Sequence, residues 1–263
     1  MKSSKKLVLA AAALAALLAG CAAPSAPQAS SPAPQGQTGE MSMVCRIVDD
    51  ARGTPLLAAQ DQPGGLYRAS LAEVPLTVDG EPATVEDLAD GMLVTLWWDG
   101  SVQCTYPMGF YELYRAEAVS SGADDRCGLA LEVLEDLWNE SEALHENITQ
   151  MAVDIDPALL PQASEREAVA WRFGEAHGIT DPYTSSWEEL CDAGVIDREN
   201  LVWNDGCHFA LALAQGESGE GNRLTFDAQK WRGGLGAIFF MDCTAQKGEG
   251  GRWSYTRGTY AIS

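Results

Sequence analysis

The sequence predicts a mixed α+β fold, in which a small OB-like β-barrel is followed by an α+β domain with helices packed on an antiparallel sheet. Three patterns carry this prediction. Short apolar runs bounded by Gly, Pro or Asp fill residues 43–114. Helical periodicity marks residues 127–144 and 164–178, and large and small side chains alternate from Cys207 to Ala214. Helices followed by a run of strands favour an α+β arrangement.

Residues 42–119 should form the small β-barrel domain. Asp99-Gly100 lies between two apolar runs and is a strong signal for a tight hairpin. Thr84 is suited to cap a short helical turn. Trp97 and Trp98 are adjacent in a strand and should therefore point to opposite faces. Many short strands in a short region favour a small barrel. The expected strands are 43–48, 56–59, 66–69, 75–78, 92–98, 102–106 and 110–114.

The polar stretch 119–125 marks the boundary to the second domain, residues 124–263. Its first helix should bury Cys127 and Trp138 on one face. Ser164-Glu165-Arg166-Glu167 matches a capping box ahead of a second helix, which Gly178 should end. Ser185 or Ser186 should cap a third helix over 187–193. The expected strands are 148–155, 207–214, 224–226, 235–243 and 253–262.

The N-terminus carries an export pattern. Lys2, Lys5 and Lys6 precede an apolar run over 7–19, which is too short for a permanent membrane span but typical of a signal peptide. Leu18-Ala19-Gly20-Cys21 then resembles the lipobox of bacterial lipoproteins. The resemblance implies a signal peptide over 1–20, a lipid on Cys21, and a protein held at the extracytoplasmic side of the cell membrane. The Pro-rich residues 21–41 should form a disordered tether.

The chain is strongly acidic. Its net charge of −21 becomes −24 when residues 1–20, with three lysines and no acid, are removed. Such a protein repels nucleic acid and anionic headgroups. An OB-like barrel without a positively charged groove is not suited to bind single-stranded nucleic acid, so we expect no nucleic-acid partner. The membrane contact should run through the lipid alone, and the partner should be a cell-envelope or extracellular molecule. Acidity could also favour divalent cations or basic partners.

Six cysteines remain once Cys21 is assigned to the lipid. Outside the cytoplasm they permit three disulfides, and the sequence does not choose among the fifteen possible pairings. No Cys-x-x-Cys pair occurs, which removes the main signature of thioredoxin-like and zinc-ribbon sites. The six are Cys45, Cys104, Cys127, Cys191, Cys207 and Cys243.

The sharpest catalytic candidates are Cys191 and Cys207, with His177 and His208 near them in the sequence. A thiol nucleophile needs an imidazole within hydrogen-bond reach. Cys207 and His208, however, should point to opposite faces of a strand, and no family signature surrounds either cysteine. Structural roles are therefore favoured. Asp154-Ile155-Asp156 begins like a calcium loop but lacks the later ligands. No cofactor is expected.

Other stretches resemble uncharacterised domains of Gram-positive-type lipoproteins. They carry no activity that can be transferred. The sequence therefore favours a non-catalytic binding module, with a cell-envelope hydrolase as the alternative. The binding module should expose an apolar or aromatic patch, and the hydrolase should show a cleft with a perturbed ionisable group. The stretches are Thr105-Tyr106-Pro107, Lys230-Trp231-Arg232, 242–245 and 253–255.

Overall fold

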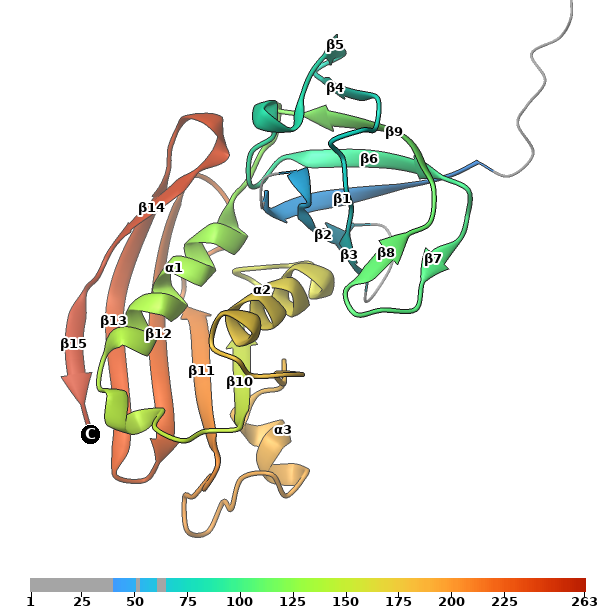
Figure 1. The fold of residues 1–263 in the computed structure, drawn as a ribbon. Helices are drawn as coiled ribbons and strands as arrows, with labels where there is room; N and C mark the ends of the chain where they lie inside the picture. Colours follow the sequence, from blue (N-terminus) through green and yellow to red (C-terminus); the bar gives the residue numbers. More distant parts are fainter. Residues whose placement is uncertain (1–39, 51–52, 61–64) are drawn as a thin grey trace, which may run out of the picture. The chain divides into compact units, whose positions relative to one another are not determined.

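The computed structural model describes residues 40–50, 53–60 and 65–263, which belong to one compact unit. The expected signal peptide, Cys21 and nearly all of the expected tether lie outside these residues. The fold is a mixed α+β fold with two sheets and three α-helices (Figure 1). No helix in the described part of the chain is both long and apolar enough to cross a bilayer.

The first sheet has nine short strands in the order β5-β4-β9-β6-β1-β2-β3-β8-β7. Two pairs, β3–β8 and β4–β9, are parallel, and the other pairs are antiparallel. Thr84 begins a 3-10 turn over Val85–Asp87, as expected. The strands are β1 Met41–Asp49, β2 Leu56–Ala59, β3 Leu66–Arg68, β4 Leu76–Val78, β5 Glu81–Pro82, β6 Leu93–Trp98, β7 Val102–Gln103, β8 Met108–Phe110 and β9 Leu113–Val119.

This sheet curls around its own apolar core, but its described strands do not close into a barrel. Leu57, Leu96 and Ala116 come from three different strands and lie in one buried cluster. The ring of Phe110 packs against Tyr67 and Trp98. The outer strands β5 and β7 contain two residues each, too few for a seam that would join the edges. The OB-like barrel is therefore not confirmed.

The hairpin predicted at Asp99-Gly100 is wrong, because the two strands that flank this turn do not pair with each other. The turn exists, and Gly100 has a φ of +91° that favours glycine. Strand β6, however, pairs with β1 on one side and β9 on the other, and β7 pairs with β8. Both edges of β6 are occupied by longer strands, so the strand after the turn has no edge to join.

The second sheet has the order β10-β11-β12-β13-β14, with β15 also on β13. It is mixed rather than fully antiparallel, since β10 runs parallel to β11. One predicted strand, 253–262, is split at Arg257-Gly258. A Cβ on Gly258 would lie 2.1 Å from the Met241 carbonyl oxygen, so only glycine allows this close approach. The strands are β10 Gln150–Ile155, β11 Gly206–Leu213, β12 Arg223–Gly233, β13 Gly236–Lys247, β14 Trp253–Thr256 and β15 Thr259–Ile262.

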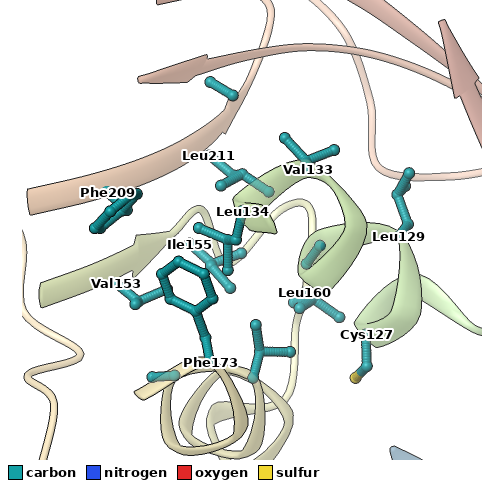
Figure 2. Packing of buried hydrophobic residues seen from close by; sticks show 14 of the residues in the cluster. Cys127, Leu129, Val133, Leu134, Val153, Ile155, Leu160, Phe173, Phe209 and Leu211 are labelled. Atoms are coloured by element: carbon teal, nitrogen blue, oxygen red, sulfur yellow. The ribbon is translucent and has the colours of Figure 1, made fainter. Parts of the chain in front are cut away.

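Helices α1 (Arg126–Asn139) and α2 (Ala163–Ala176) pack on one face of the second sheet. Phe173 of α2 points between Leu134 of α1 and the strands that carry Val153 and Phe209 (Figure 2). The rings of Phe173 and Phe209 meet edge to face at 5.0 Å. Buried residues of the first sheet belong to the same cluster, so the two predicted domains share a core. The division into domains itself stays a prediction.

Helix α3 (Trp187–Asp192) packs on the opposite face of the second sheet, which corrects the expectation that all helices share one face. Leu190 and Trp203 meet Ala152 there. Strand alternation explains the result, because Ala152 lies between two residues, Met151 and Val153, that face the other helices.

The capping box expected at Ser164 is wrong. Helix α2 begins at Ala163 after Gln162, which makes no side-chain cap. The Ser164 hydroxyl instead donates to the Ala59 carbonyl oxygen at 2.5 Å. Contact with the first sheet therefore determines the role of Ser164. In α3, by contrast, the cap predicted at Ser185 or Ser186 is confirmed at Ser186, which also forms a capping box with Glu189.

Candidate functional site

The structure does not bring the predicted cysteine and histidine residues into a catalytic pair. Cys207 is buried on the face covered by α1, and its thiol donates to the Trp231 carbonyl oxygen at 3.4 Å. Burial raises the pKa of Cys207 to about 12. His208 follows on β11 and therefore faces the α3 side. Cys191 lies on α3, and burial raises its pKa as well. A catalytic thiol needs the opposite shift.

His177 has a structural environment at the end of α2. Its Nε2 lies 3.0 Å from Glu135 Oε1, and its ring stacks on Trp138 with centroids 3.8 Å apart. The other face of Trp138 carries His145, at 3.9 Å. This sandwich of an indole between two imidazoles fixes both histidines. No local sequence pattern indicates this arrangement, because His177 at the end of α2 is far along the chain from Trp138 and His145.

Lys230 is a second feature that sequence reasoning missed. It is fully buried, and its ammonium group donates to the carbonyl oxygens of Trp138 and Glu140, at 3.0 and 2.7 Å. It also lies 2.7 Å from His145 Nδ1. These carbonyl groups end helix α1, so Lys230 on β12 closes the C-terminus of that helix. Burial followed by the charge of Lys230 lowers the pKa of His145 to about 4.

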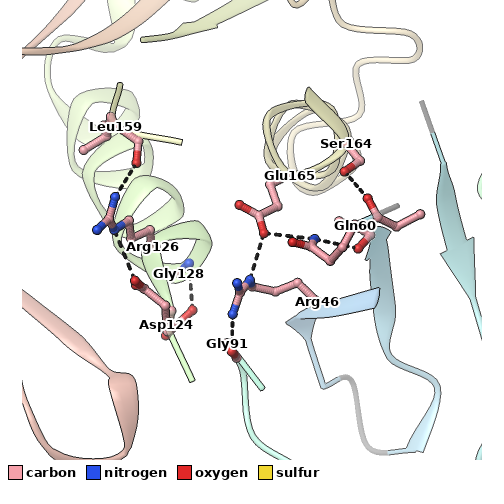
Figure 3. Close-up of polar contacts among 12 residues, drawn as sticks. Arg46, Gln60, Gly91, Asp124, Arg126, Gly128, Leu159, Ser164 and Glu165 are labelled. Carbon is pink, nitrogen blue, oxygen red and sulfur yellow. Dashed lines mark hydrogen bonds and ion pairs between the residues drawn. The ribbon is translucent and has the colours of Figure 1, made fainter. Parts of the chain in front are cut away.

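A polar cleft of about 390 Å³ lies where the first sheet meets α1 and α2, and Figure 3 shows the polar contacts there. Arg46 Nε of β1 donates to Glu165 Oε1 at 2.8 Å, and Gln60 Nε2 donates to the same oxygen at 3.1 Å. On the other side, Arg126 lies 3.4 Å from Asp124 and donates to a backbone carbonyl. Arg46 and Arg126 thus each form an ion pair at this cleft, with Glu165 and Asp124 respectively. We interpret the cleft as a polar joint between the sheets.

A smaller cavity of about 230 Å³ has different chemistry. We call it the aromatic cavity. Tyr106 comes from the β7–β8 loop, Glu167 and Trp171 come from α2, and Asp181 comes from the segment after α2. Glu167 and Trp171 lie four positions apart and so share one helix face. Tyr106 is 51% exposed, whereas Trp171 is half-buried. Two aromatic rings thus flank an opening that two carboxylates also reach. Pro182 and Thr184 complete the lining.

The carboxylates of the aromatic cavity have no cationic partner in the described part of the chain. The Tyr106 hydroxyl donates to Glu167, and no ion pair reaches Glu167 or Asp181. Burial, followed by the hydrogen bond to Glu167 and the nearby charge of Asp181, raises the pKa of Tyr106. Both carboxylates therefore lie close enough to act on one hydroxyl group. On the same helix, Glu165 and Glu175 each form an ion pair with an arginine.

The wall formed by Asp181 and Pro182 is held in place by backbone contacts. The next residue, Tyr183, pairs with β10, because the Val153 N–H donates to the Tyr183 carbonyl oxygen at 2.8 Å. A Cβ on Gly174 would lie 3.1 Å from Pro182, so the end of α2 packs closely against this segment. The aromatic cavity is thus built on a helix and a sheet edge, which favours preorganised binding.

Leu201, Val202 and Leu235 form an exposed apolar surface around an opening of about 430 Å³. Leu235 is 99% exposed at the β12–β13 turn. Asn200, Asn204 and Arg232 also line this opening, so polar groups surround the apolar patch.

The described residues contain no group of three His, Cys, Asp or Glu side chains placed to hold a metal ion. Asp156, in the calcium-like stretch, instead accepts hydrogen bonds from the backbone N–H groups of Ala158 and Leu213. This carboxylate therefore stabilises the turn that follows β10 and links it to the end of β11.

No protein-family model matches the chain, and no curated protein or solved structure matches it either.

Proposed function

We propose that the protein is a lipid-anchored extracytoplasmic lipoprotein that acts as a non-catalytic binding module at the cell surface. The aromatic cavity is the proposed ligand site. One observation carries this proposal: Tyr106 and Trp171 flank a preformed opening in which Glu167 and Asp181 have no cationic partner among the described residues. Ligand sites characteristically combine aromatic walls with a few polar groups that fix orientation.

The alternative, a cell-envelope hydrolase in the second domain, finds less support. It would need an activated nucleophile or acid at a cleft. Burial raises the pKa of both Cys191 and Cys207, and His208 faces away from Cys207. The binding module is therefore the proposal that the geometry favours.

The ligand site is tested by ligand-observed NMR on the full-length chain in a neutral detergent. The probes are cationic, neutral and anionic N-acetyl amino-acid amides. We expect at least one class to bind the wild type and to lose that binding in Tyr106→Ala. Tyr106 is half-exposed, so this variant should fold. Tyr111→Ala is the control, because Tyr111 is 69% exposed and does not line the aromatic cavity. Equal binding by Tyr106→Ala would exclude the site.

The anchor has its own test. Cys21→Ser removes the proposed attachment point of the lipid, and two or more acyl chains are what hold such a protein stably at a membrane. We expect the variant to move from the membrane fraction to the soluble fraction. Cys104→Ser, at an exposed cysteine, should stay with the membrane. Continued membrane association of Cys21→Ser would refute the lipoprotein assignment.

A further inference from the structure

We propose that the aromatic cavity binds an organic cation, that is, an ammonium or guanidinium group such as the end of a lysine or arginine side chain. The inference rests on the proposed function and names the ligand class. It starts from Tyr106 and Trp171, whose ring faces carry negative electrostatic potential. A cation within about 6 Å of such a face is attracted to it.

The carboxylates supply the opposite charge. Glu165, Glu167 and Glu175 all lie on α2, and among the residues that the structure describes only Glu167 of the three lacks an arginine partner. Asp181 has no arginine partner within the described part of the chain either, and it lines the same opening. Two unpaired carboxylates beside partly buried aromatic rings form a region of negative potential. An organic cation would complete the same kind of ion pair that the neighbouring glutamates form within the chain.

Trp171 already shows the relevant contact in this structure. The guanidinium carbon of Arg68 lies 5.0 Å from the centroid of its ring. Arg68 is not a lining residue of the aromatic cavity and contributes to a separate opening. The indole can thus pair with a cation, and it also lines the aromatic cavity.

The volume of the aromatic cavity and the net charge of the chain point to the same ligand class. A volume of about 230 Å³ suits the end of a side chain or a small amine. The net charge of −21 attracts cations over a long range and repels anions. A bare divalent metal fits less well, because calcium needs six to eight oxygen ligands and aromatic walls provide none.

The test measures affinity by NMR titration of the full-length chain in neutral detergent. The cationic probes are N-acetyl-lysine amide and N-acetyl-arginine amide. N-acetyl-glutamine amide is the neutral control, N-acetyl-glutamate amide is the anionic control, and calcium chloride is the metal control. We expect the two cationic probes to bind at least about fivefold more tightly than the neutral one. Binding should weaken as salt is added.

The variants separate the local site from the overall charge. Glu167→Gln and Asp181→Asn each remove one cavity charge at nearly constant volume and should weaken cation binding about three- to tenfold. Asparagine tolerates the left-handed backbone of Asp181, whose φ is +54°. Glu217→Gln removes the same charge at an exposed position away from the cavity and should leave the affinity unchanged. Equal weakening by all three variants would overturn the inference.

The outcomes also distinguish the two proposals. If a neutral or anionic probe binds more tightly than the cations and Tyr106→Ala abolishes that binding, the binding module stands and the cation inference is wrong. Tighter binding of calcium than of either amide would likewise reject an organic cation. If none of the probes binds, both proposals fall.

Discussion

His208 is an ionisable residue that tertiary packing places in an apolar environment. Its side chain is 1% exposed, and neither ring nitrogen makes a hydrogen bond of ordinary geometry, although the Ser185 backbone lies close. Its register partners are Ala152 on β10 and Trp231 on β12. Burial lowers its pKa from 6.5 to about 4. The imidazole is thus held neutral against an apolar face.

This environment makes stability depend on pH. Between pH 6.5 and about 4 the unfolded chain binds a proton at His208 and the folded chain does not. Stability should therefore fall as the pH drops through this window, by up to about 3 kcal/mol from this residue. The His208→Leu variant removes this pH-dependent contribution to stability. Urea unfolding at neutral and acidic pH should show a smaller acid loss for the variant, and an equal loss would contradict the prediction.

Asp90 has the opposite shift. Burial, followed by the charges of Asp125 and Asp50, raises its pKa from 3.8 to about 7. The folded chain retains a proton that the unfolded chain has lost, so stability falls as the pH rises through this window. Asp90→Asn should stabilise the protein above about pH 7 by roughly 1–2 kcal/mol after allowance for solvent screening. The amide can still accept the hydrogen bond from the Asp50 N–H.

Thermal unfolding across this pH range tests the Asp90 prediction. Below pH 3.8 the variant and the wild type should be equally stable, because Asp90 is then protonated in both states. Glu217→Gln, at an exposed position, serves as the control and should have little effect at either pH. A neutral-pH gain in the control equal to that of Asp90→Asn would assign the effect to overall charge.

At the scale of elements, two serines at similar sequence patterns have different roles. Ser186 caps α3 and accepts from the Glu189 N–H, at the exposed start of the helix. Ser164 matches the same pattern, but it is 2% exposed and donates to β2. The sequence pattern is local, whereas burial of Ser164 depends on a strand more than a hundred residues away.

Replacing each serine by aspartate distinguishes these roles. Aspartate caps a helix about as well as serine, so Ser186→Asp should change stability by less than about 0.5 kcal/mol. Ser164→Asp places a carboxylate with no hydrogen to donate against the Ala59 carbonyl oxygen, and should cost at least about 3 kcal/mol. Denaturant unfolding measures both. If the two variants were equally stable, Ser164 would have the helix-capping role that the sequence predicts.

For the whole molecule, the cysteines have different environments, from the exposed Cys104 to the buried Cys127, Cys207 and Cys243. Cys104, Cys127, Cys191, Cys207 and Cys243 carry free thiols. Cys127, Cys207 and Cys243 belong to one hydrophobic cluster. In this fold, apolar residues of both sheets pack in that cluster and join the two sheets.

Thiol labelling followed by mass spectrometry tests this arrangement. In the folded protein the exposed Cys104 should react first, and the half-buried Cys191 should react more slowly. Cys127, Cys207 and Cys243 should react only after unfolding in denaturant without a reductant, because burial protects them. If cysteines stay protected in denaturant until a reductant is added, the protein contains disulfides and the prediction is wrong.

The sequence by itself determined the mixed α+β class, most helix and strand positions, the cap of α3, and the opposite faces of Trp97 and Trp98. The structure bears out each of these: Trp98 is buried against Phe110, whereas Trp97 lies under the guanidinium group of Arg115. These features depend on side-chain periodicity and on caps within a few residues, so the local sequence is sufficient.

Only the tertiary structure decided which strands pair, which face α3 covers and which polar groups meet. Strand β6 could not form its predicted hairpin, because β1 and β9 compete successfully for its edges. In the candidate site, Tyr106 and Glu167 are 61 positions apart, and the contact exists only because the β7–β8 loop reaches α2. Such contacts depend on competition among distant segments for the same strand edge or surface. A local sequence pattern does not predict which segment will occupy it.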